Sequence, residues 1–142
     1  MSTALDRLKS ITNKISSYER ARKDNLLLLQ NLYNELGINE KVDVFSDLFN
    51  FKAINLSGAS LLSENLGEIK KDKYMQILAI GYDKEAVVKS KNISLGYFGK
   101  AQNVDEKLKN KIVEFIIRFR FEKSFMTLEH YYSMLESFKA NE

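Results

Sequence analysis

The side chains that most often carry out catalysis are scarce in this chain. It contains no cysteine and a single histidine, His130. Thiolate chemistry and metal sites with several histidine ligands therefore cannot be built within one chain. A nucleophilic serine would have to be activated by His130, and no serine stands in a recognisable nucleophile turn. We interpret His130 as a surface or boundary residue of a C-terminal helix.

The glycines and the carboxylates indicate no reaction either. Gly96 and Gly99 lack the spacing and the lysine of a loop that binds phosphates. The 19 Asp and Glu residues form no arrangement that sequence alone identifies as catalytic, although an enzyme that uses only carboxylates would leave no signature of this kind. We therefore predict that the protein is not an enzyme and has no catalytic residue, cofactor or metal ligand.

Length and composition favour one folded domain over residues 1–142. A chain of 142 residues with 44% hydrophobic and 11% aromatic residues can bury a core and is not disordered. The absence of cysteine, of an apolar signal segment and of a membrane-spanning run predicts a cytoplasmic protein with no membrane contact. Abundant Lys, Asn and Ile without proline suggest an AT-rich bacterial or phage genome.

A long amphipathic helix is predicted over residues 3–36. Thr3 and Asp6 can satisfy the free N–H groups of the first turn, and Gly37 can adopt the left-handed conformation that ends a helix. Apolar residues recur at alternating steps of three and four, which is the seam pattern of a coiled coil. The seam positions that we predict to lie in a dimer or partner interface are Leu8, Ile11, Ile15, Tyr18, Arg22 and Asn25.

The two halves of this helix should differ in role. A helix over residues 3–36 would span about 50 Å, whereas the remaining residues would form a body only about 35 Å across. Residues 26–36 have a wide apolar face, which is typical of burial in a core. Residues 1–18 have a narrow stripe, which either a second copy of the chain or the last helix, through Tyr131 and Tyr132, would have to cover.

Arg22 and Asn25 interrupt the seam near its middle, and two interpretations are open. In one, Asn25 pairs with the same residue of a second copy and fixes the register of a dimer. In the other, the helix bends away from its partner there, and both side chains are solvated.

The rest of the chain predicts an α+β fold. A sheet of two or three strands is expected, with strands over 74–82 and 93–98 and an edge strand over 51–56. The 74–82 segment is apolar on both faces, which predicts a strand covered on both sides, and Tyr97 and Phe98 are interpreted as core. Residues 86–91 are expected to form either a strand or a helical turn. Residues 39–49 are expected to form a short helix. Two C-terminal helices are expected, one capped by Asn103 and one capped by Thr127.

We predict a non-catalytic interaction, regulatory or inhibitor protein that forms a homodimer through its first helix and binds another protein. The alternative function is nucleic-acid binding, because basic residues gather in the middle of the chain. The side chains that would contact nucleic acid are Lys70, Lys71, Lys73, Lys89, Lys91, Arg118 and Arg120.

Overall fold

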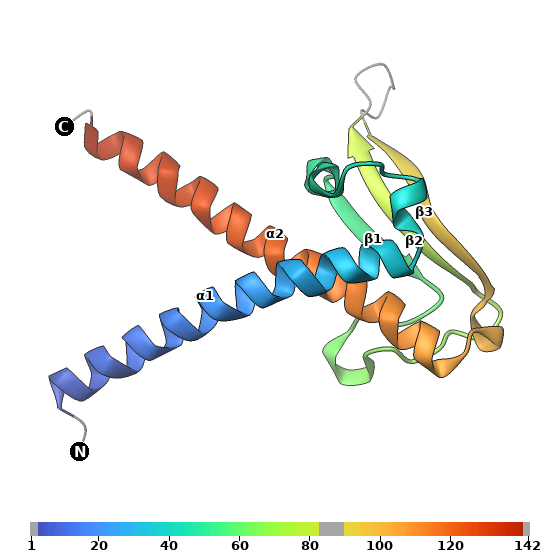
Figure 1. The fold of residues 1–142 in the computed structure, drawn as a ribbon, viewed down its shortest axis with the longest axis horizontal. Helices are drawn as coiled ribbons and strands as arrows, with labels where there is room; N and C mark the ends of the chain where they lie inside the picture. The colour runs from blue at the N-terminus through green and yellow to red at the C-terminus, as the bar shows by residue number, and fades with distance from the viewer. Residues whose placement is uncertain (1–2, 83–89, 141–142) are drawn as a thin grey trace.

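The computed structural model describes residues 3–82 and 90–140, and it shows two long helices and a small sheet (Figure 1). The sheet is antiparallel, with three strands in the order β1-β2-β3. Short 3-10 helices lie in the connections. In chain order, the helices and strands are α1 (Ala4–Glu35), β1 (Ala53–Ser57), β2 (Tyr74–Tyr82), β3 (Ser90–Lys100) and α2 (Glu106–Ala140). The predicted α+β class is confirmed.

Helix α1 begins and ends where its sequence signals lie. The Thr3 hydroxyl accepts a hydrogen bond from the Asp6 N–H at 3.1 Å, and the Asp6 carboxylate accepts one from the Thr3 N–H at 3.2 Å. This reciprocal pair is a capping box, which satisfies N–H groups that the first turn leaves free. Gly37 follows the last turn with a φ of 72°, in the left-handed region.

Helix α2 is one continuous helix, so the prediction of two C-terminal helices is wrong. Thr127 does not cap a second helix, because its hydroxyl donates to the Lys123 carbonyl one turn earlier at 2.9 Å. The start of the helix is also two residues later than expected. Asp105 caps it by accepting from the Leu108 N–H at 2.8 Å, and Asn103 belongs to a short 3-10 turn, Ala101–Asn103.

Strand β2 has the predicted bounds and is central, with β1 and β3 as the two edges. Its Met75, Ile77 and Ala79 side chains are fully buried against the core. The prediction that both faces are covered is wrong, because Tyr74 on the opposite face is half exposed. Strand β3 extends beyond the predicted 93–98. It begins at residue 90, and most of the undecided 86–91 segment lies outside the described residues.

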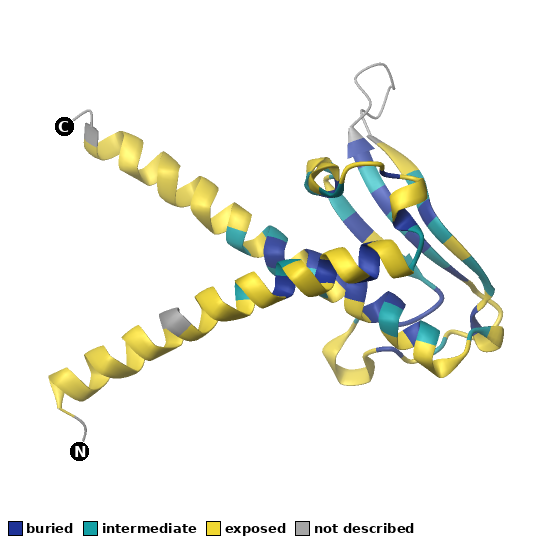
Figure 2. Ribbon diagram, viewed as in Figure 1, coloured by how far each residue is buried: buried dark blue, intermediate teal, exposed yellow. Residues whose placement is uncertain are grey.

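The core lies between the inner face of the sheet and the parts of the two helices nearest to it, as the buried segments in Figure 2 show. Helix α1 contributes Leu29, Leu32 and Tyr33, and α2 contributes Phe115 and Phe119, among others. The prediction that the second half of α1 belongs to the core is confirmed for these three residues, whereas Leu27 and Leu28 of its wide apolar face are exposed. Buried apolar side chains of this size each stabilise the fold by roughly 1.5–3 kcal/mol.

The predicted helix over 39–49 is instead a pair of short 3-10 helices, Ile38–Glu40 and Phe45–Asn50. Phe45 and Phe49 extend a row of aromatic contacts that starts at Tyr33 and ends at Phe119, with ring centroids 5.4 to 5.7 Å apart. The Tyr33 hydroxyl donates to the Val42 carbonyl, and burial raises the pKa of this phenol. The segment therefore covers one end of the core.

Gly58, which directly follows β1, is the glycine that tolerates an added side chain least. Its φ is 101°, and an added Cβ would lie 2.8 Å from the Met75 Cα and from the Tyr74 carbonyl oxygen. Both neighbours are backbone atoms, which cannot move aside cheaply. Gly58→Ala is therefore expected to lower the free energy of unfolding by about 2 kcal/mol. Urea unfolding measures this loss, with Gly99→Ala as the control, because its φ is also positive but the space around it is open.

Candidate protein interface

Helices α1 and α2 cross beside the sheet and then diverge into solvent (Figure 1). We call residues 4–21 the α1 arm and residues 126–140 the α2 arm. Every described side chain of either arm is exposed, as the yellow segments of Figure 2 show. The two arms therefore do not cover each other, contrary to the alternative in which the C-terminal helix shields the N-terminal one.

Large apolar side chains line both arms. Leu8 is 60% exposed and Phe138 is 66% exposed, although both are side chains that proteins normally bury. A monomer seldom leaves a contiguous apolar patch of this kind uncovered. The exposed large apolar residues on the two arms are Leu5, Leu8, Ile11, Tyr18, Met126, Leu128, Tyr131, Tyr132, Met134, Leu135 and Phe138.

Each arm has apolar residues at the spacing of a coiled-coil seam. On the α1 arm the predicted seam residues Leu8, Ile11 and Tyr18 are exposed, and the Ile15 side chain lies outside the described residues. The α2 arm repeats the alternation of three and four through Leu128, Tyr131, Leu135 and Phe138. The sequence alone predicted only that Tyr131 and Tyr132 of this segment could cover the N-terminal helix, and it predicted no intermolecular interface here.

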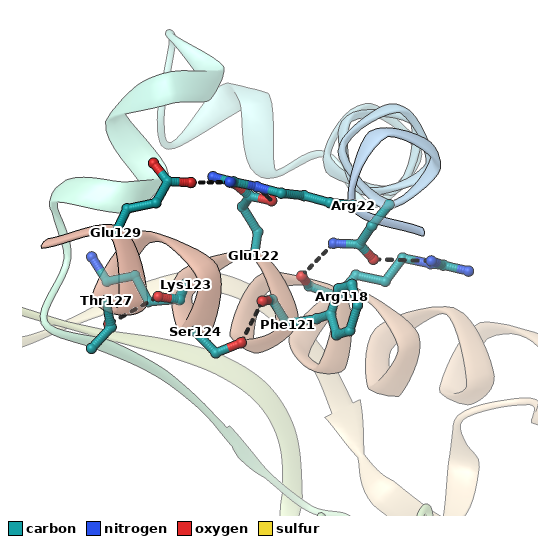
Figure 3. A network of polar contacts seen from close by, with 9 residues as sticks. Arg22, Arg118, Phe121, Glu122, Lys123, Ser124, Thr127 and Glu129 are labelled. Carbon is teal, nitrogen blue, oxygen red and sulfur yellow. Dashed lines mark hydrogen bonds and ion pairs between the residues drawn. The ribbon is translucent and has the colours of Figure 1, made fainter. Parts of the chain in front are cut away.

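A salt bridge holds the two helices together where they cross (Figure 3). The Arg22 Nε lies 3.0 and 3.1 Å from the two Glu122 carboxylate oxygens, and its Nη2 lies 2.8 Å from one of them. Arg22 also donates to Glu129, and its guanidinium lies 5.2 Å from the centre of the Phe125 ring. Hydrogen bonding to Glu122 raises the pKa of Arg22, so this side chain stays charged.

Asn25 completes the crossing one turn further along α1. Its Nδ2 donates to the Arg118 carbonyl at 2.9 Å, and its Oδ1 accepts from the Arg118 Nη1 at 3.0 Å. Asn25 is 97% buried by these contacts within its own chain. The interpretation that its side chain is solvated is therefore wrong, and both polar atoms of its amide already have a partner without a second copy.

A groove lies beside the crossing, between α1, α2 and the connection before β2. It has a volume of about 510 Å³, and its walls include Ala21 of α1, Leu66 of the connection before β2, and Ile117 and Phe121 of α2. Phe121 precedes Leu128 by seven residues, so it continues the seam of the α2 arm. Phe121 therefore lies on the same side of α2 as the apolar residues of the α2 arm.

The residues predicted to contact nucleic acid do not gather at one place. Lys70, Lys71 and Lys73 lie just before β2, whereas Lys91 pairs with Gly81 near the other end of that strand, about 20 Å away. Lys89 lies outside the described residues. The two arginines are occupied elsewhere: Arg118 binds Asn25 and Glu114, and Arg120 donates to the Ile54 carbonyl and the Asn55 side chain on β1.

His130 is exposed on the α2 arm, with its ring centre 5.7 Å from that of Tyr131. Within residues 3–82 and 90–140, no group of three or more His, Cys, Asp or Glu side chains is placed to hold a metal ion. No helix in this part of the chain combines the length and the hydropathy that crossing a membrane requires.

Comparisons with protein-family models, with curated proteins and with solved structures find no match to this chain.

Proposed function

We propose that the protein is a non-catalytic interaction protein that acts as a homodimer, in which a second copy covers both arms. The observation that supports this proposal is that both arms expose apolar residues at coiled-coil spacing. The two arms diverge from a crossing that buried polar contacts stabilise. The original hypothesis assigned the dimer to the N-terminal helix alone. The exposure of the α2 arm extends the proposed interface to both helices.

Helix length supports the need for a partner. Each arm is 15 to 18 residues long, and most of the stability of a helix in a protein comes from packing of its apolar face. The crossing fixes one end of each arm and leaves the remaining turns without an apolar partner in their own chain. Association would supply that partner to both arms at once.

Charge favours pairing of unlike arms. The α1 arm has four basic and two acidic residues, whereas the α2 arm has two acidic residues and one basic residue. An α1 arm is therefore attracted more to an α2 arm than to a second α1 arm. In a two-fold symmetric dimer, the α1 arm of each copy would lie along the α2 arm of the other, which forms a four-helix arrangement with matched seams.

Light scattering tests this proposal directly, because it measures mass in solution. At micromolar concentration we expect twice the chain mass of 16.4 kDa, with a reversible shift toward the chain mass on dilution. The proposal would be contradicted if the protein scattered as a monomer at micromolar concentration and also at concentrations about 100 times higher. A partner protein from another gene would then be the remaining way to cover the arms.

A further inference from the structure

The outer face of the sheet carries two exposed tyrosines side by side. Tyr74 on β2 is 50% exposed and Tyr97 on β3 is 59% exposed, so the interpretation of Tyr97 as a core residue is wrong. Their ring centres lie 5.8 Å apart and their planes are tilted by 32°. Within the described residues, neither ring is covered by a helix, because both helices pack on the opposite face. Both rings are therefore accessible to a planar ligand.

Uncharged hydrogen-bonding side chains surround this pair. Gln76 lies directly opposite Tyr97 on the neighbouring strand and opposite Ser57 on the other. The Gln76 amide donates to the Ser94 hydroxyl at 2.8 Å, which leaves the Gln76 carbonyl oxygen to accept from a ligand. Tyr74 and Gln76 lie on one face of β2 because they are two residues apart. Two register shifts between β2 and β3 bring Ser94 and Tyr97 onto the same face, where they pair with Leu78 and Gln76.

The charge around the tyrosines is positive. The three strands contain no Asp or Glu at all. Lys100 lies opposite Tyr74 in the sheet, and the turn that leads into Tyr74 contributes three lysines, Lys70, Lys71 and Lys73, against one acidic residue, Asp72. Among the described residues, none of these four lysines lies within ion-pair distance of a carboxylate. The face is therefore suited to an anionic partner.

We propose that this face binds single-stranded nucleic acid. Tyr74 and Tyr97 stack on successive bases, Gln76 and its neighbours contact base edges, and the four lysines contact the phosphates. A duplex would leave the tyrosines without exposed base faces, so single strands are preferred. The site differs from the predicted one, since it excludes Lys91, Arg118 and Arg120. It is complete in each copy and does not depend on the dimer.

Fluorescence anisotropy with labelled single-stranded RNA and DNA of about 12 nucleotides tests the proposal at low salt. We expect both single strands to bind, with an affinity that falls steeply as salt is added. Tyr74→Ala together with Tyr97→Ala should weaken binding at least tenfold, because base stacking is lost. Tyr74→Phe together with Tyr97→Phe keeps the ring faces and should bind within about twofold of the unmodified chain.

The lysines provide a second comparison. Lys73→Ala with Lys100→Ala should weaken binding and reduce its salt dependence, whereas Lys9→Ala with Lys14→Ala, which removes the same charge from the α1 arm, should leave both unchanged. Circular dichroism checks that each variant is folded. The proposal is overturned if single strands do not bind at low salt, if a duplex of equal length binds as tightly, or if the alanine variant at Tyr74 and Tyr97 binds like the unmodified chain. Light scattering on the same samples reports the dimer separately.

Discussion

Leu8→Asp combined with Ile11→Asp is expected to convert the dimer into a folded monomer. Both residues lie on the exposed seam of the α1 arm, where the proposed dimer would bury them. Each carboxylate would lose its hydration in an apolar interface without a partner, at a cost of several kcal/mol. Because the proposed dimer is two-fold symmetric, each substituted residue occurs twice in its interface. We expect the dissociation constant to rise at least about a thousandfold, equivalent to about 4 kcal/mol.

The matched control adds the same charge to the same helix on the side away from the seam. Ser10 and Asn13 are exposed and lie off the predicted seam, so Ser10→Asp with Asn13→Asp should leave the dimer intact. Light scattering gives the mass of each variant, and circular dichroism confirms that the body remains folded. If both double variants dissociate equally, net charge and not burial of the seam governs association.

A parallel substitution on the α2 arm distinguishes the two ways of pairing. Leu128→Asp with Leu135→Asp should dissociate a dimer in which unlike arms pair, as the charge distribution favours. A dimer formed by the α1 arms alone would survive this change. The result therefore distinguishes an interface formed by both arms from the interface predicted from the sequence, which used the N-terminal helix alone.

Arg22→Ala is expected to be the most destabilising single substitution at the helix crossing. Glu122 is 96% buried as a side chain, and Arg22 supplies its charge partner. Removing the arginine leaves a buried carboxylate without compensation, which costs about 3 kcal/mol or more. Urea unfolding at one fixed protein concentration measures this change, because the stability of a dimer depends on concentration.

Two further variants test whether the salt bridge between Arg22 and Glu122 stabilises the helix crossing. Arg20→Ala removes a neighbouring exposed arginine and should change the free energy of unfolding by less than about 0.5 kcal/mol. Arg22→Met with Glu122→Leu replaces both charges by apolar groups and should recover most of the loss. If Arg22→Ala unfolds at the same urea concentration as the unmodified chain, the salt bridge does not hold the crossing together.

Local signals predicted α1 and β2 well because the residues that decide them are close in the sequence. The cap at Thr3, the stop at Gly37 and the alternation from Tyr74 to Tyr82 each depend on a few neighbouring positions. The continuity of α2 was missed because Thr127 resembles a cap. No glycine or proline breaks the segment, and the hydroxyl of Thr127 bonds to the preceding turn instead.

The crossing and the open sheet face depend on contacts between distant parts of the chain. Asn25 and Arg118 are 93 residues apart, so periodicity within α1 could not show that the amide is used internally. The exposure of Tyr97 likewise depends on both helices packing on one face of the sheet. Apolar alternation in a strand does not reveal which of its faces is covered. The apolar seam of the α2 arm, in contrast, could have been predicted from the sequence, because the residues from Leu128 onward follow the same spacing as the α1 seam.

Amide hydrogen exchange along the two arms tests most directly whether a second copy covers them. At concentrations where the protein scatters as a dimer, we predict slow exchange over residues 4–21 and 126–140. Dilution, or Leu8→Asp with Ile11→Asp, should speed exchange in both arms together while the amides of β2 stay protected. Fast exchange in both arms at every concentration, with no difference between the unmodified chain and this variant, would contradict the account.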